Sequence, residues 1–249
     1  MATAATILGS GGFVPTGTRE TSCVLLLPED SDRVVIVDAG TGLRRIVTDP
    51  DLLQGRRRID ILLSHFHIDH VCGVPYLTEV SYDELTVHGP GAALYDTPTA
   101  ELLRRVFAPP IMPIGPEAIG LQLAEIAPGE IEVGGLDVRI RRQDRHTNPT
   151  LGFRFGDELV WCTDTEADPG TVDFARGARV LAHEAWGPPA APGHAEPAAV
   201  GRMATEAGVA AVVLIHVPPK ADEADLQARA AAEHGNVTVA TDGLLLHQL

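Results

Sequence analysis

The feature that most constrains the fold is a cluster of histidines that directly follows an apolar run. Residues 63–70 read LSHFHIDH. His65 and His67 are two positions apart, so in an extended segment their side chains lie on the same side. Asp69 and His70 follow in a predicted turn, and neutral imidazole and carboxylate are ligands for Zn, Mn or Fe. Because one ion rarely takes four ligands from six residues, this density favours two adjacent ions over a polar loop with coincidental histidines.

Three further candidate ligands stand at the ends of other apolar segments. His146 follows VRIRRQDR, Asp164 follows ELVWCT, and His216 follows AAVVLI. The competing interpretations are a loop histidine for His146 and a turn or cap aspartate for Asp164. A purely structural role explains His216 least well of the three, because a histidine at the end of such an apolar strand has little structural reason to be there. The sequence thus supplies enough ligands for a binuclear site.

Short apolar segments punctuated by Gly, Pro or Asp predict a chain rich in strands. A helix is expected to start within 73–81, and the proline-rich stretch 108–120 is predicted to be a loop. The last segment, 236–249, is predicted to form two terminal strands. Strands with a few late helices predict two packed sheets with helices outside. The other predicted strands are 4–9, 22–27, 33–38, 59–64, 85–90, 121–126, 131–133, 136–142, 151–155, 158–162, the start of 180–188, and 210–219; the other predicted helices are 97–107, 197–209 and 224–235.

The length of 249 residues suits one large domain or two small ones. The two parts of the chain look alike, since each carries strands first and a histidine at the end of an apolar strand. We expect a single domain, 1–249, with pseudo-duplicated halves at about 1–115 and 116–249.

The net charge limits which binding partners are expected, and the cysteine content limits which cellular compartment is expected. The formal net charge of −15 argues against a broad electrostatic grip on tRNA or DNA. Three cysteines with no close pairing fit a reducing compartment. The first residues lack the pattern of a signal peptide, and no run of about 18 apolar residues predicts a membrane span. We therefore expect a cytoplasmic protein that acts on a small molecule and does not enter a membrane.

Eight segments, taken in order, make the chain similar to a known family. It resembles the metallo-β-lactamase-fold hydrolases, most of all the branch of tRNase Z and small phosphodiesterases, and the resemblance runs nearly end to end. It implies an α/β fold built as a four-layer αββα sandwich, with a dinuclear metal site at one edge between the two sheets. The segments are LGSGGFVPTGTRETSCVLL, VVIVDAGTG, LLSHFHIDHVCGVPYL, HTNPTLGFRF, WCTDT, LAHEAW, PGHAE and VVLIHVPP.

The resemblance also implies how the ligands divide. One ion is expected on His65, His67 and His146, and the other on Asp69, His70 and His216. Asp164 is expected to bridge the two. The implied cofactors are two divalent metal ions, zinc foremost, with manganese or iron as alternatives. The implied nucleophile is a bridging hydroxide whose pKa is lowered by two cations, with Asp69 orienting it or accepting its proton.

Three other residues receive expected roles from the same resemblance. His194 in PGHAE matches the histidine that protonates the leaving group, although Ala195 follows it where the branch carries a hydroxyl residue. Glu184 is expected to orient His194, with a surface or cap carboxylate as the alternative. Arg19 is expected to grip substrate phosphate, with a solvated surface arginine as the alternative. Structural roles are expected for Cys72, His88, His183, His234 and His247.

The expected reaction is hydrolysis of a small phosphodiester, cyclic ones included, because two cations can neutralise the attacking and leaving oxygens. A tRNA substrate is disfavoured because only eighteen residues separate Asp164 from His183, with no basic run for a tRNA-binding arm. The branch also suggests a homodimer.

The main alternative is a lactonase, thioesterase or β-lactamase-like acyl hydrolase. In that case, residues 107–116 would line an apolar substrate pocket. A non-catalytic metal-binding module is the third interpretation.

Overall fold

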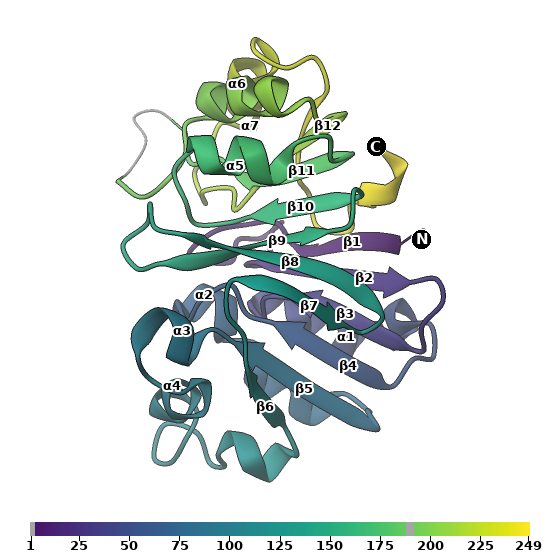
Figure 1. Cartoon of the computed structure of the whole chain (residues 1–249). Coiled ribbons are helices and arrows are strands. Elements are labelled where there is room, and N and C mark those ends of the chain that lie inside the picture. The colour runs from purple at the N-terminus through teal and green to yellow at the C-terminus, as the bar shows by residue number, and fades with distance from the viewer. Residues whose placement is uncertain (1–2, 188–191) are drawn as a thin grey trace.

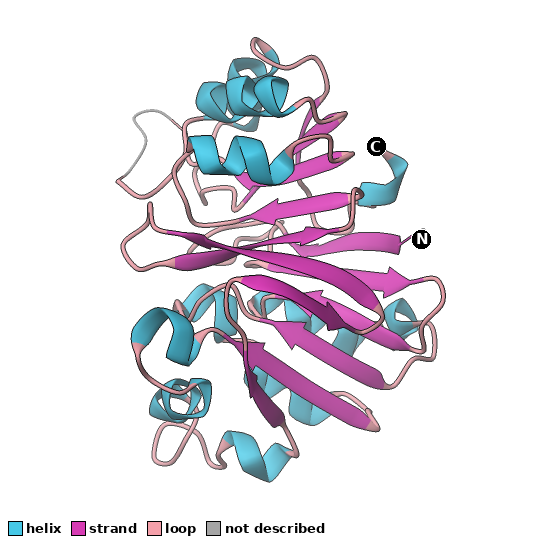
Figure 2. Cartoon of the chain, in the orientation of Figure 1, coloured by secondary structure: helices cyan, strands magenta, loops and turns pink. Residues whose placement is uncertain are grey.

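The chain folds into two facing sheets with helices on both outer faces, and the computed structural model describes residues 3–187 and 192–249 (Figures 1 and 2). The first sheet has six strands in sequential order. Its β1–β2 and β2–β3 pairs are antiparallel, whereas β3 to β6 are parallel. The strands are β1 (Thr3–Gly9), β2 (Cys23–Pro28), β3 (Arg33–Val37), β4 (Arg58–Leu62), β5 (Glu84–Gly89) and β6 (Gln122–Glu125).

The second sheet has seven strands in the order β13-β12-β11-β10-β9-β8-β7. Here β7 to β10 are antiparallel and β10 to β13 are parallel. The strands are β7 (Gly129–Val133), β8 (Leu136–Gln143), β9 (Thr150–Phe155), β10 (Leu159–Cys162), β11 (Val180–Glu184), β12 (Ala211–Ile215) and β13 (Val237–Val239).

Helices cover the outer faces of both sheets, and α5, α6 and α7 lie together beside β10–β12 (Figure 1). Among the described residues, every helix is too short or too polar to cross a bilayer. The α-helices are α1 (Arg44–Thr48), α2 (Ile68–Val71), α3 (Gly91–Tyr95), α4 (Thr99–Val106), α5 (Pro169–Ala175), α6 (Pro197–Ala207) and α7 (Glu223–Ala231); the 3₁₀ helices are η1 (Thr41–Leu43), η2 (Pro50–Leu53), η3 (Val74–Glu79), η4 (Pro116–Ile119) and η5 (Leu246–Gln248).

The main core lies between the two sheets. In β8, Leu136, Val138 and Ile140 point into this core, whereas Asp137 and Arg139 between them are exposed. This alternation follows from the two-residue period of a strand. A second core lies between the first sheet and its helices, and a third lies between the second sheet and α5–α7. The fold is therefore the αββα sandwich that the sequence predicts.

The parallel strands direct their carboxyl ends toward common edges of the sheets. The loop after β4 carries His65, Asp164 follows β10, and His216 follows β12. In sheets of this kind, residues just beyond the strand ends gather in a crevice suited to ligands. The topology thus explains why ligand candidates far apart in the sequence can meet.

Several parts of the secondary structure differ from the prediction, among them the short helices α1 and α3 and the 3₁₀ helix η4 within the predicted loop 108–120. The second terminal strand is wrong: Leu246–Gln248 forms the 3₁₀ helix η5, because the buried Leu246 packs into the main core and only Leu245 bridges to Thr6 in β1. Helix α5 was not predicted, although Asp168 caps it and Pro169 opens it. The chain passes between the sheets after β6, later than the expected division at 115/116.

The buried His183 in β11 should make the stability of the fold depend on pH. Its Nδ1 donates to the carbonyl oxygen of Glu184 at 2.8 Å, and its buried Nε2 has no hydrogen-bond partner among the described residues. Burial lowers the pKa of His183 from 6.5 to about 4. The unfolded chain therefore binds this proton first as the pH falls, so stability is lost between about pH 6.5 and pH 4.

We expect the free energy of unfolding to fall by about 2 kcal/mol more in the wild type than in His183→Asn between pH 7 and pH 5. Denaturant titrations at both pH values measure this difference. His247→Asn, at an exposed position, serves as the matched control and should behave as the wild type. Equal losses in the wild type and His183→Asn would contradict the assignment.

Candidate metal centre

The first ligand group combines the loop after β4 with the loop between β8 and β9. His65, His67, His146 and Asp164 present ligand atoms that all lie within 4.8 Å of one another. His65 is fully buried, and its Nε2 makes no hydrogen bond to any described residue. A buried nitrogen without a partner is costly unless something binds it. This atom therefore fits a metal ligand.

Hydrogen bonds at the outer nitrogen of each imidazole fix which nitrogen faces the centre. His146 Nδ1 donates to the carbonyl oxygen of Gly193 at 2.9 Å, which leaves Nε2 as the free acceptor. His67 Nε2 donates to Asn148 Oδ1 at 3.0 Å, which leaves Nδ1. The two free nitrogens lie 3.3 Å apart. Outer hydrogen bonds of this kind orient the histidines of metal sites.

The second ligand group consists of Asp69 and His70 in α2 and His216 after β12. His216 Nε2 lies 3.2 Å from Asp69 Oδ2. His70 Nδ1 donates to Asp38 Oδ2 at 2.7 Å, so its Nε2 faces the centre. Sequence reasoning did not single out Asp38, although it lies directly after β3, just as His216 lies directly after β12.

Asp164 lies between the two groups. Its Oδ1 is 3.5 Å from His146 Nε2 in the first group. Its Oδ2 is 3.0 Å from His70 Nε2 and 3.4 Å from His216 Nε2 in the second. One carboxylate oxygen thus faces each group, which is the arrangement that a shared ligand requires.

The electrostatics of the centre favour a cation. Burial, together with the neighbouring His70, lowers the pKa of His65 well below its ordinary value, so the imidazole is in the neutral form that coordinates metals. Burial would also lower the pKa of His70, but Asp38, Asp164 and Asp69 outweigh it and raise the pKa. A negative field that attracts a proton to this nitrogen also attracts a divalent metal ion.

His194 and Glu184 form a pair next to the second ligand group. His194 Nδ1 lies 2.7 Å from Glu184 Oε2, and Glu184 Oε1 accepts the backbone N–H of Thr165 at 2.7 Å. Burial raises the pKa of Glu184 well above its ordinary value and lowers that of His194. Both pKa shifts favour a pair of neutral side chains over an ion pair. In the neutral pair, Glu184 donates to His194 Nδ1, and the proton of His194 itself is on Nε2.

Backbone strain is concentrated around this centre. Six non-glycine residues among those described have a positive φ, and four of them, Phe13, Asp38, Asp164 and His216, belong to the centre or its surroundings. Their φ angles are between 50° and 66°. Such residues persist where the surrounding structure enforces them, and they cluster at functional sites.

Arg19 is placed differently from the other predicted site residues. It is buried, and its guanidinium donates to Ser10 Oγ and to the carbonyl oxygen of Ala240 and pairs with Glu223 at 2.7 Å. None of these partners lines the cavity beside the ligands. This placement favours a structural role for Arg19 instead of the predicted grip on phosphate.

A cavity of about 310 Å³ opens over the ligand groups. Ligands from both groups and His194 line it together with three residues that sequence reasoning did not single out, namely Phe13, Thr147 and Trp186. The indole of Trp186 stacks on His194 with ring centroids 4.5 Å apart. A cavity of this size is at the lower end of the range for small-molecule sites.

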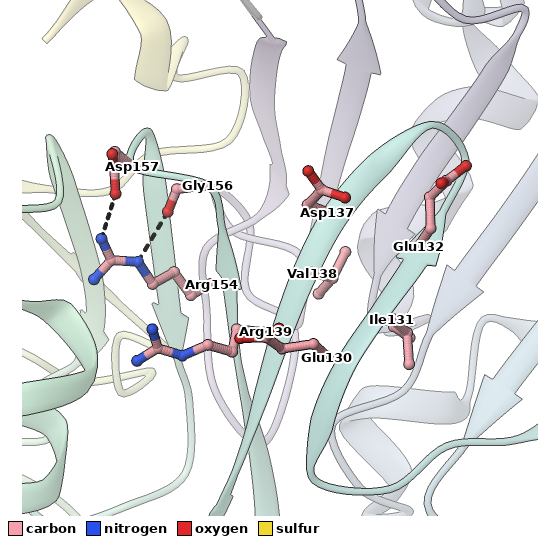
Figure 3. A pocket seen from close by; sticks show the side chains of 9 residues that line it. All are labelled: Glu130, Ile131, Glu132, Asp137, Val138, Arg139, Arg154, Gly156 and Asp157. Carbon is pink, nitrogen blue, oxygen red and sulfur yellow. Dashed lines mark hydrogen bonds and ion pairs between the residues drawn. The ribbon is translucent and has the colours of Figure 1, made fainter.

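A larger cavity of about 580 Å³ lies elsewhere, on β7–β9 (Figure 3). Arg154 in this cavity is engaged by the carbonyl oxygen of Gly156 and the carboxylate of Asp157, and no histidine or cysteine lines it. This cavity is larger than the one over the ligand groups, but the chemistry favours the smaller one.

Comparison with known proteins supports the same interpretation. The family model described as Beta-lactamase superfamily domain matches residues 33–217. The ribonuclease Z of Methanopyrus kandleri is 27% identical over 291 residues, covering 96% of this chain and 95% of that protein. The ribonuclease Z of Bradyrhizobium diazoefficiens is 31% identical over 163 residues, covering 61% of this chain and 49% of that protein. The chain thus matches about half the length of this second relative.

Solved structures share the fold. YhfI from Bacillus subtilis, a metallo-β-lactamase fold protein, has a TM-score of 0.80 at 19% identity and covers 98% of this chain and 99% of its own. A diphosphatase of the PhnP family has a TM-score of 0.77 at 19% identity, covering 98% and 97%. The family match spans most of the chain and includes all seven predicted metal ligands, so the chain belongs to the beta-lactamase superfamily.

Proposed function

We propose that this chain is a dinuclear metal-dependent phosphodiesterase that acts on a small phosphodiester. The observation that carries the proposal is the pair of ligand groups that share Asp164, with His194 beside them. His65, His67 and His146 would hold one divalent ion, and Asp69, His70 and His216 the other. Zinc is the proposed metal, since histidine and carboxylate ligands suit it. Bound ions would activate water and neutralise phosphate charge.

The protein's own groups would guide the proton transfers. Asp69 accepts the backbone N–H of Phe13 through Oδ2 at 2.9 Å. This contact fixes the carboxylate in the cavity, where it can orient water or accept its proton. His194, with its proton on Nε2, would protonate the leaving oxygen, and Glu184 would return a proton to Nδ1. This transfer is general acid catalysis by a positioned imidazole.

The cavity supports a small substrate. The described residues of its lining include no arginine or lysine, whereas proteins hold the successive phosphates of a nucleic acid with cationic side chains. The net charge of −15 acts in the same direction. The eighteen residues between Asp164 and His183 consist mainly of α5 and the start of β11, with no projecting arm. We therefore take from the ribonuclease Z relatives the type of bond that is hydrolysed, a phosphodiester, and not tRNA as the substrate.

The acyl hydrolase alternative receives no support from the segment expected to line its pocket. Within 107–116, Phe107, Met112 and Ile114 line a separate narrow cavity next to η3. That cavity shares no residue with the one over the metal ligands. We therefore favour the phosphodiesterase.

Removing a ligand should abolish both metal binding and activity. We expect His67→Ala and Asp164→Ala to lose bound metal and to lower the turnover of bis-4-nitrophenyl phosphate by at least about 10²-fold. Elemental analysis after dialysis and a steady-state assay measure the two effects, and circular dichroism checks folding. Asp164→Ala with full metal content and turnover would refute a bridging role.

Asn148 should affect metal affinity without being a ligand. Asn148→Ala removes the acceptor that orients His67, and loss of such an outer partner typically weakens metal binding by roughly 10–100-fold. Competition with a chromophoric chelator measures the affinity. Asn236→Ala, at an exposed asparagine away from the cavity, should not change it. An unchanged affinity in Asn148→Ala would show that His67 needs no such support.

His194 should matter most for poor leaving groups. We expect His194→Ala to retain its metal and to lose about 10²–10⁴-fold in kcat on diesters with alkyl leaving groups, but far less on 4-nitrophenyl esters, which leave without a proton. Glu184→Gln, which can still donate to Nδ1 but not transfer a proton, should give an intermediate loss. Equal effects of His194→Ala on both substrate types would remove His194 from proton transfer.

A further inference from the structure

Two aromatic side chains stand at the metal cavity without a role in the chemistry described above. Phe13 and Trp186 both line the cavity, together with ligands of both metal groups. They come from distant parts of the chain, since Phe13 lies in the loop after β1 and Trp186 follows β11. We propose that they form a binding site for a flat aromatic group of the substrate, so that the preferred phosphodiester carries a nucleobase or another aryl ester. This inference rests on the proposed phosphodiesterase function.

The position of Phe13 is the first argument. Its side chain is 65% exposed, although burial of a phenylalanine is normally favourable by roughly 1.5–3 kcal/mol. Its backbone has φ of 66°, which is unfavourable for a bulky residue. The N–H bond to Asp69 holds this conformation, and Gly12 before it passes so close to the His216 ring that any side chain would clash. The backbone of Phe13 is therefore held beside the cavity by contacts with two metal ligands, and its side chain lines the cavity.

The surroundings of Trp186 are the second argument. Its indole stacks on His194 at 21° between ring planes and lies 5.5 Å from the His216 ring. Its backbone N–H donates to the carbonyl oxygen of Ala195 at 2.9 Å. The indole is half-buried beside the proposed proton donor. Because it lines the cavity, a substrate ring bound there would contact it.

The composition of the cavity is the third argument. Its polar groups are metal ligands, His194 and Thr147, and these are suited to the phosphate and the bonds around it. Among the described residues of the lining, Phe13 and Trp186 carry the large apolar surfaces. Aromatic stacking on a nucleobase is favourable and tolerates any base. The aromatic pair therefore selects for a flat ester group and not for a particular sequence.

Three diesters with the same leaving group test this proposal: the 4-nitrophenyl phosphates of methanol, phenol and the 5′-hydroxyl of thymidine. In each, water attacks phosphorus and the bond to 4-nitrophenolate breaks, so only the retained ester group differs. We expect the wild type to favour both aromatic esters in kcat/KM over the methyl ester. Phe13→Ala should lower this preference by about 10-fold, and Phe13→Tyr should keep it. If the wild type prefers only the thymidine ester over the methyl ester, the site recognises a nucleobase. If it prefers the phenyl ester equally, the site recognises any aryl group.

Val14→Ala is the matched control, because Val14 is the exposed neighbour of Phe13 but does not line the cavity. Direct binding of the product thymidine 5′-phosphate, followed by calorimetry, should weaken in Phe13→Ala with unchanged metal content. Turnover of all three diesters with no aromatic preference, or a preference that survives Phe13→Ala, overturns the inference and leaves the proposed function intact. If Phe13→Ala changes the molecular mass in solution and lowers all three rates equally, the ring is a contact between copies. No turnover of any diester by the metal-loaded wild type contradicts the proposed function and this inference together.

Discussion

The structure depends on one buried carboxylate, that of Asp164, which faces two groups of ligands at once. A buried carboxylate is costly unless cations or hydrogen bonds compensate its charge. Burial would raise its pKa, but the surrounding histidines, His216 and His70 first, hold that pKa well below its ordinary range. Thr163 donates to one of its oxygens at 2.7 Å. The charge is thus maintained at the point where two divalent ions would meet, and the ligand loops converge around it.

The sandwich provides that convergence because its strands end where the chemistry is needed. The loops after β3, β4, β10 and β12 bring Asp38, His65, Asp164 and His216 to a common place, and all but His65 adopt a positive φ there. The strain is offset by the three hydrophobic cores, between the sheets and under the helices on both outer faces, which hold the strands in place. Rigid strands with strained ends fix ligand atoms more precisely than a flexible loop could.

The sequence predicted the sandwich, and it named ligand candidates that the structure brings together, because both depend on short patterns. Apolar runs mark the strands, and a histidine or aspartate at the end of such a run has few structural explanations. The sequence was less informative where tertiary contacts decide. The roles of Asn148 and Trp186 depend on His67 and His216, which lie far from them in the sequence. Arg19, expected near substrate, is instead engaged by Ala240 and Glu223, and no local pattern could have shown this.

The central claim is that the two ligand groups form one dinuclear centre. Equilibrium titration of the metal-depleted wild type with Zn²⁺, followed by elemental analysis and X-ray absorption at the zinc edge, tests it most directly. The account predicts two ions per chain at saturation, nitrogen and oxygen ligands only, and a second zinc roughly 3.5–4 Å from the first, as in other two-metal sites. Saturation at one ion per chain, or sulfur among the ligands, would contradict it.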